Sequence, residues 1–334
     1  MWDGLLGEKE NTLPLRDSTK RFREMVEVLR RRHLLQGITP VKIRQILEDL
    51  GPTFVKLGQI MSMRPDFLPQ EYCDELTKLQ TGAKPLAFSL IRDIIEKEYG
   101  CCWSQIFRSI DEAALGSASI AQVHQAVLTN GERVVVKVQR PGIYEVMAKD
   151  IVLLKRAAAL LKVVGNTSDV IDFSMILDEM WTIAKQEMDF LMEASHIDEF
   201  RHLNADAPYV ECPAVYHKLT TSRILVMEYI DGIRFDDVAA LEAQGFDMDH
   251  LGHRLGENYV KQIVEDGYFH ADPHPGNIWI RGGKIVWLDL GMMGRLSSRD
   301  RSALRKAVFA LANHDTLEMK AAVLSLGLPR GRID

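Results

Sequence analysis

The residues best suited to chemistry lie between positions 270 and 291. The segment His270–Asn277 reads His-Ala-Asp-Pro-His-Pro-Gly-Asn, and Asp289 follows one predicted hairpin later. Phosphoryl transfer needs a carboxylate at the attacking hydroxyl, together with an amide and a second carboxylate that hold Mg²⁺ against the phosphates. Asp272, Asn277 and Asp289 supply these three groups, and their spacing therefore indicates phosphoryl-transfer chemistry.

The hairpin predicted after Asn277 decides whether these groups can meet. Its turn, Arg281-Gly282-Gly283, returns the chain to the edge from which it started, so we expect Asp289 beside Asn277. The alternative is a turn-rich loop whose Asp and Asn side chains only bond the local backbone. A zinc site at His270 and His274 is disfavoured, because ligands four residues apart require a helix and two prolines interrupt this segment.

One lysine lies inside a predicted strand whose neighbours are almost all apolar. Lys137 belongs to the run Arg133–Gln139, and burial of an unpaired ammonium is strongly unfavourable. It therefore needs an anion, either a nucleotide phosphate or a carboxylate from the long helix that follows, for which Glu187 is a candidate. The alternative is a lysine that reaches solvent along its stem from an edge strand.

Small residues precede the first strand of this region. They would let backbone N–H groups approach phosphates, as a glycine-rich loop does, although a close helix or strand contact explains small residues equally well. We predict that four of them bind nucleotide: Gly116, Ser117, Ala118 and Ser119. We also assign Glu228 and Tyr229, near the end of the β-rich run 223–230, to nucleotide binding.

These groups depend on a mixed series of helices and strands for their positions. Helices are predicted over 22–29, from Thr39-Pro40 to Gly51, over 54–61, from Ser89 to Gly100, over 175–194 and from Ser298 onward. Runs at 120–128 and 133–139, joined through Asn130-Gly131, predict a hairpin whose two central turn residues both have positive φ. The order of elements predicts an α+β fold.

Composition excludes several classes of protein. The 334 residues are 46% hydrophobic and 26% charged, which is ordinary for a globular chain with a large core. A net charge of −6 disfavours nucleic acid as a partner. The four cysteines form no Cys-x-x-Cys pair, which favours the reducing cytosol. No signal peptide is visible in residues 1–10, and no apolar run reaches the roughly 18 residues that cross a bilayer.

Taken in order, these motifs resemble the UbiB/AarF family of atypical kinase-like proteins, from about Leu50 to Gly294. The matching segments are Lys-x-Gly-Gln at 56–59, an alanine-rich nucleotide loop at 117–124, Glu-x-Asp at 187–189 with Glu-Ala at 193–194, the catalytic segment at 270–277 and Asp-Leu-Gly at 289–291. The resemblance implies a bilobal protein-kinase-like fold that binds ATP and Mg²⁺. An N-terminal helical extension would lie over its active site.

The family pattern also implies roles for single residues. Lys137 contacts phosphates, Asp272 is the catalytic carboxylate, and Asn277 and Asp289 hold the metal. The extension carries Lys-x-Gly-Gln, whose lysine pairs with one of two glutamates, and this arrangement excludes a peptide substrate. The regulatory and ion-pairing set comprises Lys56, Gln59, Glu187, Asp189 and Glu193, with Glu187 and Glu193 as the alternative partners of Lys56.

We expect three parts: the extension at 1–110, a kinase-like small lobe at 111–231, and a large lobe at 232–334 with an incomplete C-terminus. The implied function is ATPase or small-molecule kinase activity on a lipid or quinone precursor, in support of ubiquinone-type isoprenoid quinone biosynthesis. The implied partners are proteins of quinone biosynthesis. Family members usually carry a transmembrane hairpin after this region. None is found in these residues, so we expect them to be part of a longer chain. We expect the protein to be cytoplasmic and associated with the inner face of the membrane through further C-terminal segments.

Two other functions are compatible with the same residues. In the first, nucleotide occupancy switches the conformation of a scaffold, and no phosphoryl group is transferred. The second, a conventional protein kinase, is disfavoured, because such kinases carry a lysine two residues after the catalytic Asp, where this chain has His274. The loop is closer to those of aminoglycoside and choline kinases, which favours a small-molecule substrate.

Overall fold

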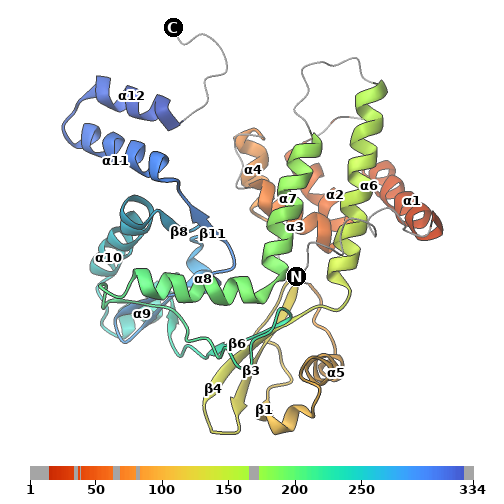
Figure 1. The fold of residues 1–334 in the computed structure, drawn as a ribbon, viewed down its shortest axis with the longest axis horizontal. Helices are drawn as coiled ribbons and strands as arrows, with labels where there is room; N and C mark the ends of the chain where they lie inside the picture. The colour runs from red at the N-terminus through yellow and green to blue at the C-terminus, as the bar shows by residue number, and fades with distance from the viewer. Residues whose placement is uncertain are drawn as a thin grey trace. The chain divides into compact units, whose positions relative to one another are not determined.

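The computed structural model describes residues 15–33, 37, 39–62, 68–79, 83–164 and 173–326. The chain divides into two compact units, Met1–Asp189 and Phe190–Asp334, and each is described by itself. Helices and mostly antiparallel strands make up the predicted α+β fold (Figure 1). Residues 1–10, on which the signal-peptide prediction rests, lie outside the described residues.

The first unit begins with five helices: α1 (Leu15–Arg31), α2 (Pro40–Leu50), α3 (Pro52–Ser62), α4 (Gln70–Leu76) and α5 (Phe88–Tyr99). The predicted boundaries of α2 are confirmed. The Thr39 hydroxyl accepts a hydrogen bond from Lys42 N at 3.3 Å, and Gly51 ends the helix with φ of +99°. Gly100, with φ of +68°, ends α5 as predicted.

Helix α3 packs closely on its neighbours at Gly58. A Cβ atom added there would meet the Cδ1 atoms of Leu79 and Leu47, the latter at 2.7 Å, and Leu76 and Leu79 are both buried. These leucines cannot move far without opening a void elsewhere in a close-packed core. Glycine at this position therefore allows the close approach of α3.

We expect Gly58→Ala to lower the free energy of unfolding by about 1 kcal/mol, because overpacking of about 1–3 kcal/mol outweighs a helix-propensity gain of about 0.5–1 kcal/mol. The matched control is Gly256→Ala in α10 (Met248–Val260), where a Cβ meets nothing within 4 Å. That variant should be stabilised. Calorimetric unfolding of both variants measures the difference, and equal shifts of one sign would contradict the packing argument.

A small antiparallel sheet follows the short helix η2 (Trp103–Gln105). Strand β3 (Ala121–Leu128) pairs with β1 (Phe107–Ile110), β2 (Gly116–Ser117) and β4 (Arg133–Gln139). The predicted β3–β4 hairpin is confirmed, but its turn differs from the prediction. Only Gly131 has positive φ, at +92°, and Leu128 N bonds Glu132 O at 2.9 Å. The loop therefore has three residues with glycine at the bulge position, instead of two residues with positive φ.

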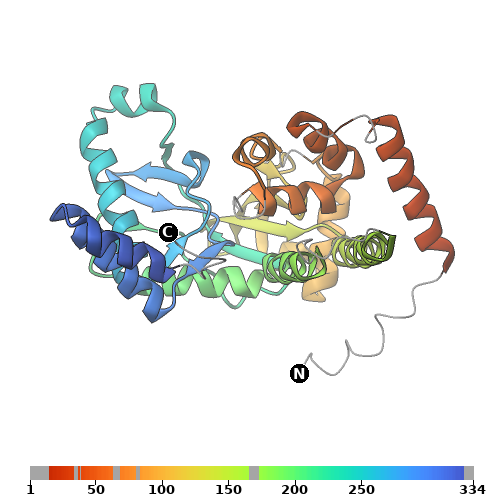
Figure 2. The same cartoon turned by 90° about the horizontal axis from the view of Figure 1, so that it is seen from above.

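Helices α6 (Ile143–Val164) and α7 (Phe173–Met188) lie side by side (Figures 1 and 2). Met147 and Ile151 of α6 join Met180 and Ala184 of α7 in one buried cluster, to which Leu57 of α3 also belongs. The first half of α6 is therefore packed in the core of this unit. Within the described residues, no helix combines the length and apolar character that crossing a membrane requires.

The single helix predicted over 175–194 is wrong. Helix α7 ends at Met188, Asp189 is not helical, and a separate helix, α8 (Phe190–Leu203), begins after it. Asp189 N bonds Gln186 O at 3.2 Å, and Phe190 N bonds Ser222 O at 3.1 Å instead of a carbonyl one turn earlier. Apolar spacing continues through the break, so periodicity alone could not reveal it.

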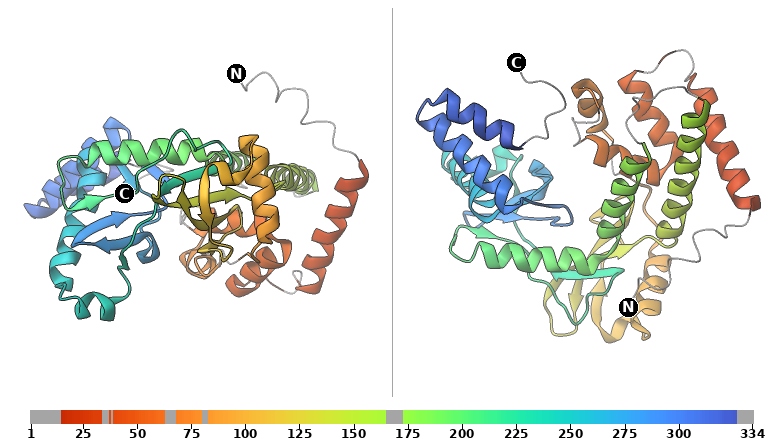
Figure 3. Two further views of the ribbon diagram at one scale, coloured as in Figure 1. Left: turned by 90° about the horizontal axis from the view of Figure 1, so that it is seen from below. Right: turned by 45° about the horizontal axis from the view of Figure 1, so that its top comes forward.

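The second unit surrounds a small mixed sheet with helices. The elements after α8 are β5 (Val210–Glu211), β6 (Ile224–Glu228), β7 (Ile233–Arg234), α9 (Val238–Ala243), α10, the π-helical turn η3 (Lys261–Asp266), β8 (Tyr268–His270), the short helix η4 (Pro275–Asn277), β9 (Ile278–Arg281), β10 (Lys284–Trp287), β11 (Met293–Arg295), α11 (Ser298–Ala312) and α12 (Thr316–Leu326). Strands β5, β10, β9 and β7 form one sheet, and β8 pairs with β11. Helices α11 and α12 pack together near the end of the chain (Figure 3).

The β9–β10 hairpin confirms the predicted turn. Gly282 and Gly283 both have positive φ, at +57° and +79°, as a two-residue turn requires. Trp287 pairs with Ile278, so the two outer ends of the hairpin meet at one edge of the sheet.

Candidate functional site

The loop from His270 to Asn277 is held by its own side chains. Asp272 N donates to His270 Nδ1 at 3.1 Å, Asn277 Nδ2 donates to Asp272 O at 3.3 Å, and Gly276 N donates to His274 Nδ1 at 3.0 Å. The bond from Asn277 uses the amide nitrogen, whereas a magnesium ligand needs the amide oxygen. Asp272 itself is exposed. Local turn bonds are thus present, as the alternative interpretation predicts, but they use the backbone of Asp272 and not its carboxylate.

The two histidines of the loop have structural partners. His270 is fully buried, and because its Nδ1 accepts from Asp272 N, its Nε2–H donates to Leu288 O at 3.1 Å. Burial lowers the pKa of His270, which keeps the ring neutral. His274 Nδ1 is occupied by Gly276 N. These contacts support the sequence argument against a zinc site at these two residues.

Asp289 lies where the hairpin brings the chain back to the loop. Leu288 N donates to Asn277 O at 2.8 Å, which fixes the residue before Asp289 against the end of the loop. Asp289 has φ of +51°, a left-handed conformation that few residues other than glycine adopt. Such strain is concentrated at functional sites, where the surrounding structure maintains it. Asp289 therefore combines an unusual backbone conformation with a position in the chain directly after the residue bonded to Asn277.

A second carboxylate reaches the same place. A Cβ atom added to Gly291 would lie 3.5 Å from Asp289 Oδ1 and 3.7 Å from Glu193 Oε2. Glu193 is buried, at 4% exposure. The carboxylates of Asp289 and Glu193 thus both approach Gly291, which has no side chain. Carboxylate oxygens are ligands that suit Mg²⁺. The chemistry of these side chains suits Mg²⁺, which Asp289 and Asn277 would hold. Glu193 is a neighbouring carboxylate that the sequence analysis assigned only to ion pairing.

The first unit contains the ion pair expected of the Lys-x-Gly-Gln motif. Lys56 Nζ pairs with Glu187 Oε2, and the two side chains are 13% and 9% exposed. Gln59 Nε2 donates to Leu79 O at 3.1 Å, which anchors the motif to the segment after α4. Of the two partners that the resemblance implied for Lys56, the structure contains Glu187. Asp189 lies at the helix break two residues later.

Lys137 lies in the middle of β4, opposite Val123 of β3. Its neighbours Val136 and Val138 are fully buried, whereas Lys137 itself is intermediate in exposure. Lys137 thus lies within a strand of mostly apolar residues, as predicted, and its side chain is only partly exposed.

The predicted nucleotide loop forms the tight turn between β2 and β3. Ala118 N donates to Ala121 O at 2.8 Å, while Arg140 donates to Ala118 O at 2.8 Å and to Ser117 Oγ at 2.7 Å. Burial lowers the pKa of Arg140. Gly116 has open space around it and no positive φ, so neither crowding nor conformation requires glycine there. The sequence analysis missed Arg140, which orders this loop from the end of β4.

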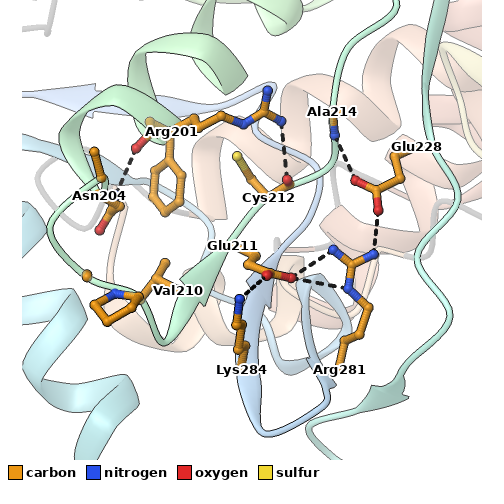
Figure 4. A pocket seen from close by; sticks show the side chains of 13 residues that line it. Arg201, Asn204, Val210, Glu211, Cys212, Ala214, Glu228, Arg281 and Lys284 are labelled. Carbon is orange, nitrogen blue, oxygen red and sulfur yellow. Dashed lines mark hydrogen bonds and ion pairs between the residues drawn. The ribbon is translucent and has the colours of Figure 1, made fainter.

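Glu228 faces a cavity of about 470 Å³ in the second unit (Figure 4). It accepts from Arg281 at 2.5 Å and from Ala214 N at 3.2 Å, and Arg281 also reaches Glu211 at 2.7 Å. Burial would raise the pKa of Glu211, but hydrogen bonds from Lys284 and Arg281 outweigh it and lower that pKa. The Glu228 side chain thus serves an ion network, so a nucleotide role would rest on its backbone and that of Tyr229.

Among the described residues, no cluster of three or more His, Cys, Asp or Glu side chains has the arrangement of a metal site. A ligand set containing Asn277 is compatible with this result, because asparagine is outside that group. The sequence analysis also missed Asn258 and Gln262, two fully buried polar residues in the helical segment before β8. Their only sequence signal is an amide among the residues of an amphipathic helix, which does not show that it is buried.

Fold and site together define a kinase-like α+β protein in which an Asp–Asn loop is followed by a hairpin that returns the chain to Asp289. Residues 78–323 match the ABC1 atypical kinase-like domain. The chain belongs to this family, which confirms the resemblance to UbiB/AarF proteins and the predicted kinase-like fold.

Several curated relatives are similar over most of this chain. It is 40% identical over 296 residues to a protein from the hydrogenase 1 5′ region of Clostridium pasteurianum, covering 89% of this chain and 56% of the relative. It is 37% identical to the chloroplastic protein ACTIVITY OF BC1 COMPLEX KINASE 8 of Arabidopsis thaliana, covering 91% and 40%. It is also 37% identical to the probable protein kinase UbiB of Cellvibrio japonicus, covering 82% and 50%. The chain thus spans about half the length of these relatives.

One solved structure shares the fold over most of its length. The Mycobacterium tuberculosis protein Rv3197, in complex with erythromycin, matches with a TM-score of 0.61 and 26% identity, covering 83% of this chain and 70% of that one.

Proposed function

We propose that this protein binds Mg-ATP and transfers or hydrolyses its terminal phosphoryl group. The observation that carries the proposal is the joint between loop and hairpin: Leu288 N bonds Asn277 O at 2.8 Å, next to the strained Asp289. Asn277 and Asp289, the residues at this joint, carry an amide and a carboxylate of the kind that phosphoryl transfer requires, which supports the proposal.

Each residue has a definite task in this reaction. The exposed Asp272 carboxylate accepts the proton of the attacking hydroxyl or water. Asn277 and Asp289 would hold Mg²⁺, which when bound neutralises charge on the phosphates. The Lys137 ammonium contributes a positive charge to the phosphates, and the turn at 117–119, ordered by Arg140, contributes backbone N–H groups.

A small molecule related to quinone precursors is the proposed substrate class. Two facts support it: the family includes a relative named UbiB, and His274 stands where protein kinases carry a lysine. Support of ubiquinone-type quinone biosynthesis, together with contacts to its proteins and to the inner face of the membrane, belongs to the same proposal. Phosphate release and phosphorylated product, assayed with and without phenolic quinone analogues, distinguish hydrolysis from transfer.

We expect Asp289→Asn to weaken Mg-ATP binding about tenfold or more, since it removes the charge of a metal ligand, and each factor of ten is about 1.4 kcal/mol. Asparagine tolerates the positive φ of Asp289, so the backbone should keep its conformation. Titration calorimetry with Mg-ATP measures the change. Affinity equal to that of the parent protein would rule out Asp289 as a metal ligand.

The scaffold alternative makes a different prediction on the same sample. A nucleotide-gated scaffold binds Mg-ATP tightly and releases no phosphate, with or without a lipid-like ligand. Calorimetry and phosphate release measured together therefore decide between an enzyme and a switch.

A further inference from the structure

A chain of buried side-chain amides lies beneath the candidate catalytic loop. Asn258 of α10 and Gln262 of η3 are both 0% exposed. Gln262 Oε1 accepts from His270 N at 3.0 Å, and Gln262 Nε2 donates to Asn258 Oδ1 at 2.8 Å. Trp287 Nε1 donates to the same Asn258 oxygen at 2.9 Å. One amide oxygen therefore receives hydrogen bonds from both sides of the site.

The two sides carry different functional residues. His270 leads into the catalytic loop, because its ring accepts the N–H of Asp272 at 3.1 Å. Trp287 ends β10, two residues before Asp289. Asn258 thus links the segment that carries the proposed catalytic carboxylate to the segment that carries the proposed metal ligand.

The outer end of the chain is anchored as well. Asn258 Nδ2 donates to Asn204 Oδ1 at 2.7 Å, and Asn204 Nδ2 donates to Phe200 O at 2.9 Å. The π-helical turn that contains Gln262 is tied down by Lys261, which donates to Leu203 O at 2.6 Å. Turns of this type are frequent at functional sites. In this network the side-chain amides of Asn204, Asn258 and Gln262 each have hydrogen-bond partners at both the oxygen and the nitrogen. A buried polar network that is fully hydrogen-bonded is rigid and specific.

We propose that Asn258 and Gln262 are positioning residues that fix the catalytic loop relative to the end of β10, and so fix Asp272 relative to Asp289. The inference rests on the proposed function, but it assigns a role that neither the motifs nor the family resemblance contain. Both residues act through the backbone of His270 and the indole of Trp287, without contact to substrate. Their loss should therefore change turnover more than nucleotide affinity.

The first test compares Gln262→Met with the parent protein. Methionine has nearly the same length but cannot accept the bond from His270 N, which leaves a buried donor unsatisfied. We expect kcat to fall about tenfold or more with KM for Mg-ATP within about twofold, because small misplacements of reacting groups are costly. The control is Gln244→Met, at the exposed end of α9, which should leave both constants unchanged.

The second test uses Gln262→Glu, whose effect depends on protonation. A neutral carboxyl reproduces both bonds, donating its O–H to Asn258 Oδ1 and accepting from His270 N. The ionised form loses the donor, so activity relative to the parent should be high at low pH and fall as pH rises. Burial lowers the pKa of the neighbouring His270 and raises the pKa values of Tyr259 and Tyr268. Because activity is expressed relative to the parent at each pH, titrations that the two proteins share cancel.

A third measurement is independent of turnover. Without nucleotide, amide hydrogen exchange at His270 and Asp272 should be slow in the parent and faster in Gln262→Met. If the parent shows no phosphate release, the proposed function fails and this exchange result still decides the positioning role. Unchanged exchange, or a Gln262→Glu to parent ratio that is flat with pH, would overturn the inference. If Gln262→Met does not fold, the pH profile of Gln262→Glu provides the decision.

Discussion

Replacement of Asp272 by asparagine should reduce turnover by about 10²-fold or more while leaving Mg-ATP affinity nearly unchanged, because general-base assistance contributes about 10²–10⁴-fold. The described hydrogen bonds of Asp272 are made by its backbone N and O atoms: N donates to His270, and O accepts from His274 N and from Asn277. Asparagine keeps these bonds and the size of the side chain. The variant therefore removes one negative charge from the loop without removing the contacts that shape it.

The measurement is single-turnover phosphate release at saturating Mg-ATP, with calorimetry on the same preparation. Asp93→Asn, on the exposed face of α5, is the matched control and should behave like the parent protein. Equal turnover in Asp272→Asn and the parent would remove the enzymatic interpretation and leave the scaffold. A loss of nucleotide affinity as large as the loss of turnover would instead place Asp272 among the binding residues.

The second large effect is expected at the ion pair of the Lys-x-Gly-Gln helix. Lys56→Met should destabilise the first unit by about 3–5 kcal/mol, because it leaves the carboxylate of Glu187 buried without a counter-charge. Glu187 Oε2 pairs with Lys56, and its Oε1 has no hydrogen-bond partner among the described residues. No other described contact compensates this charge when the ammonium is removed.

The chain offers a control with similar chemistry and a different environment. Lys78 pairs with Glu75 at 2.6 Å, but its side chain is 64% exposed, so Lys78→Met should cost no more than about 1 kcal/mol. The double variant Lys56→Met with Glu187→Gln should recover part of the loss, since no charge then remains buried. Hydrogen exchange of α3 and α7 peptides, followed by mass spectrometry, reports stability within this unit. Equal destabilisation at Lys56 and Lys78 would contradict the burial argument.

Local elements of the fold could be predicted because neighbouring residues determine them. The Thr39 cap, the Gly100 helix end and the Gly282-Gly283 turn each depend on backbone conformations and hydrogen bonds within a few positions. The loop around Asp272 belongs to the same class. The wrong prediction of one helix through Asp189 has the opposite origin, because the break there is stabilised by a bond to Ser222.

The sequence by itself determined the α+β class, the two hairpins and the proposed phosphoryl-transfer residues, since these depend on short-range spacing and on motifs shared with the family. Only the tertiary structure decided that Lys56 pairs with Glu187, that Arg140 orders the turn at 117–119, and that Asn258 bridges β8 and β10. These contacts join residues far apart in the chain. Their partners are chosen by which polar groups packing buries together, because each buried group must then find its hydrogen bond or counter-charge.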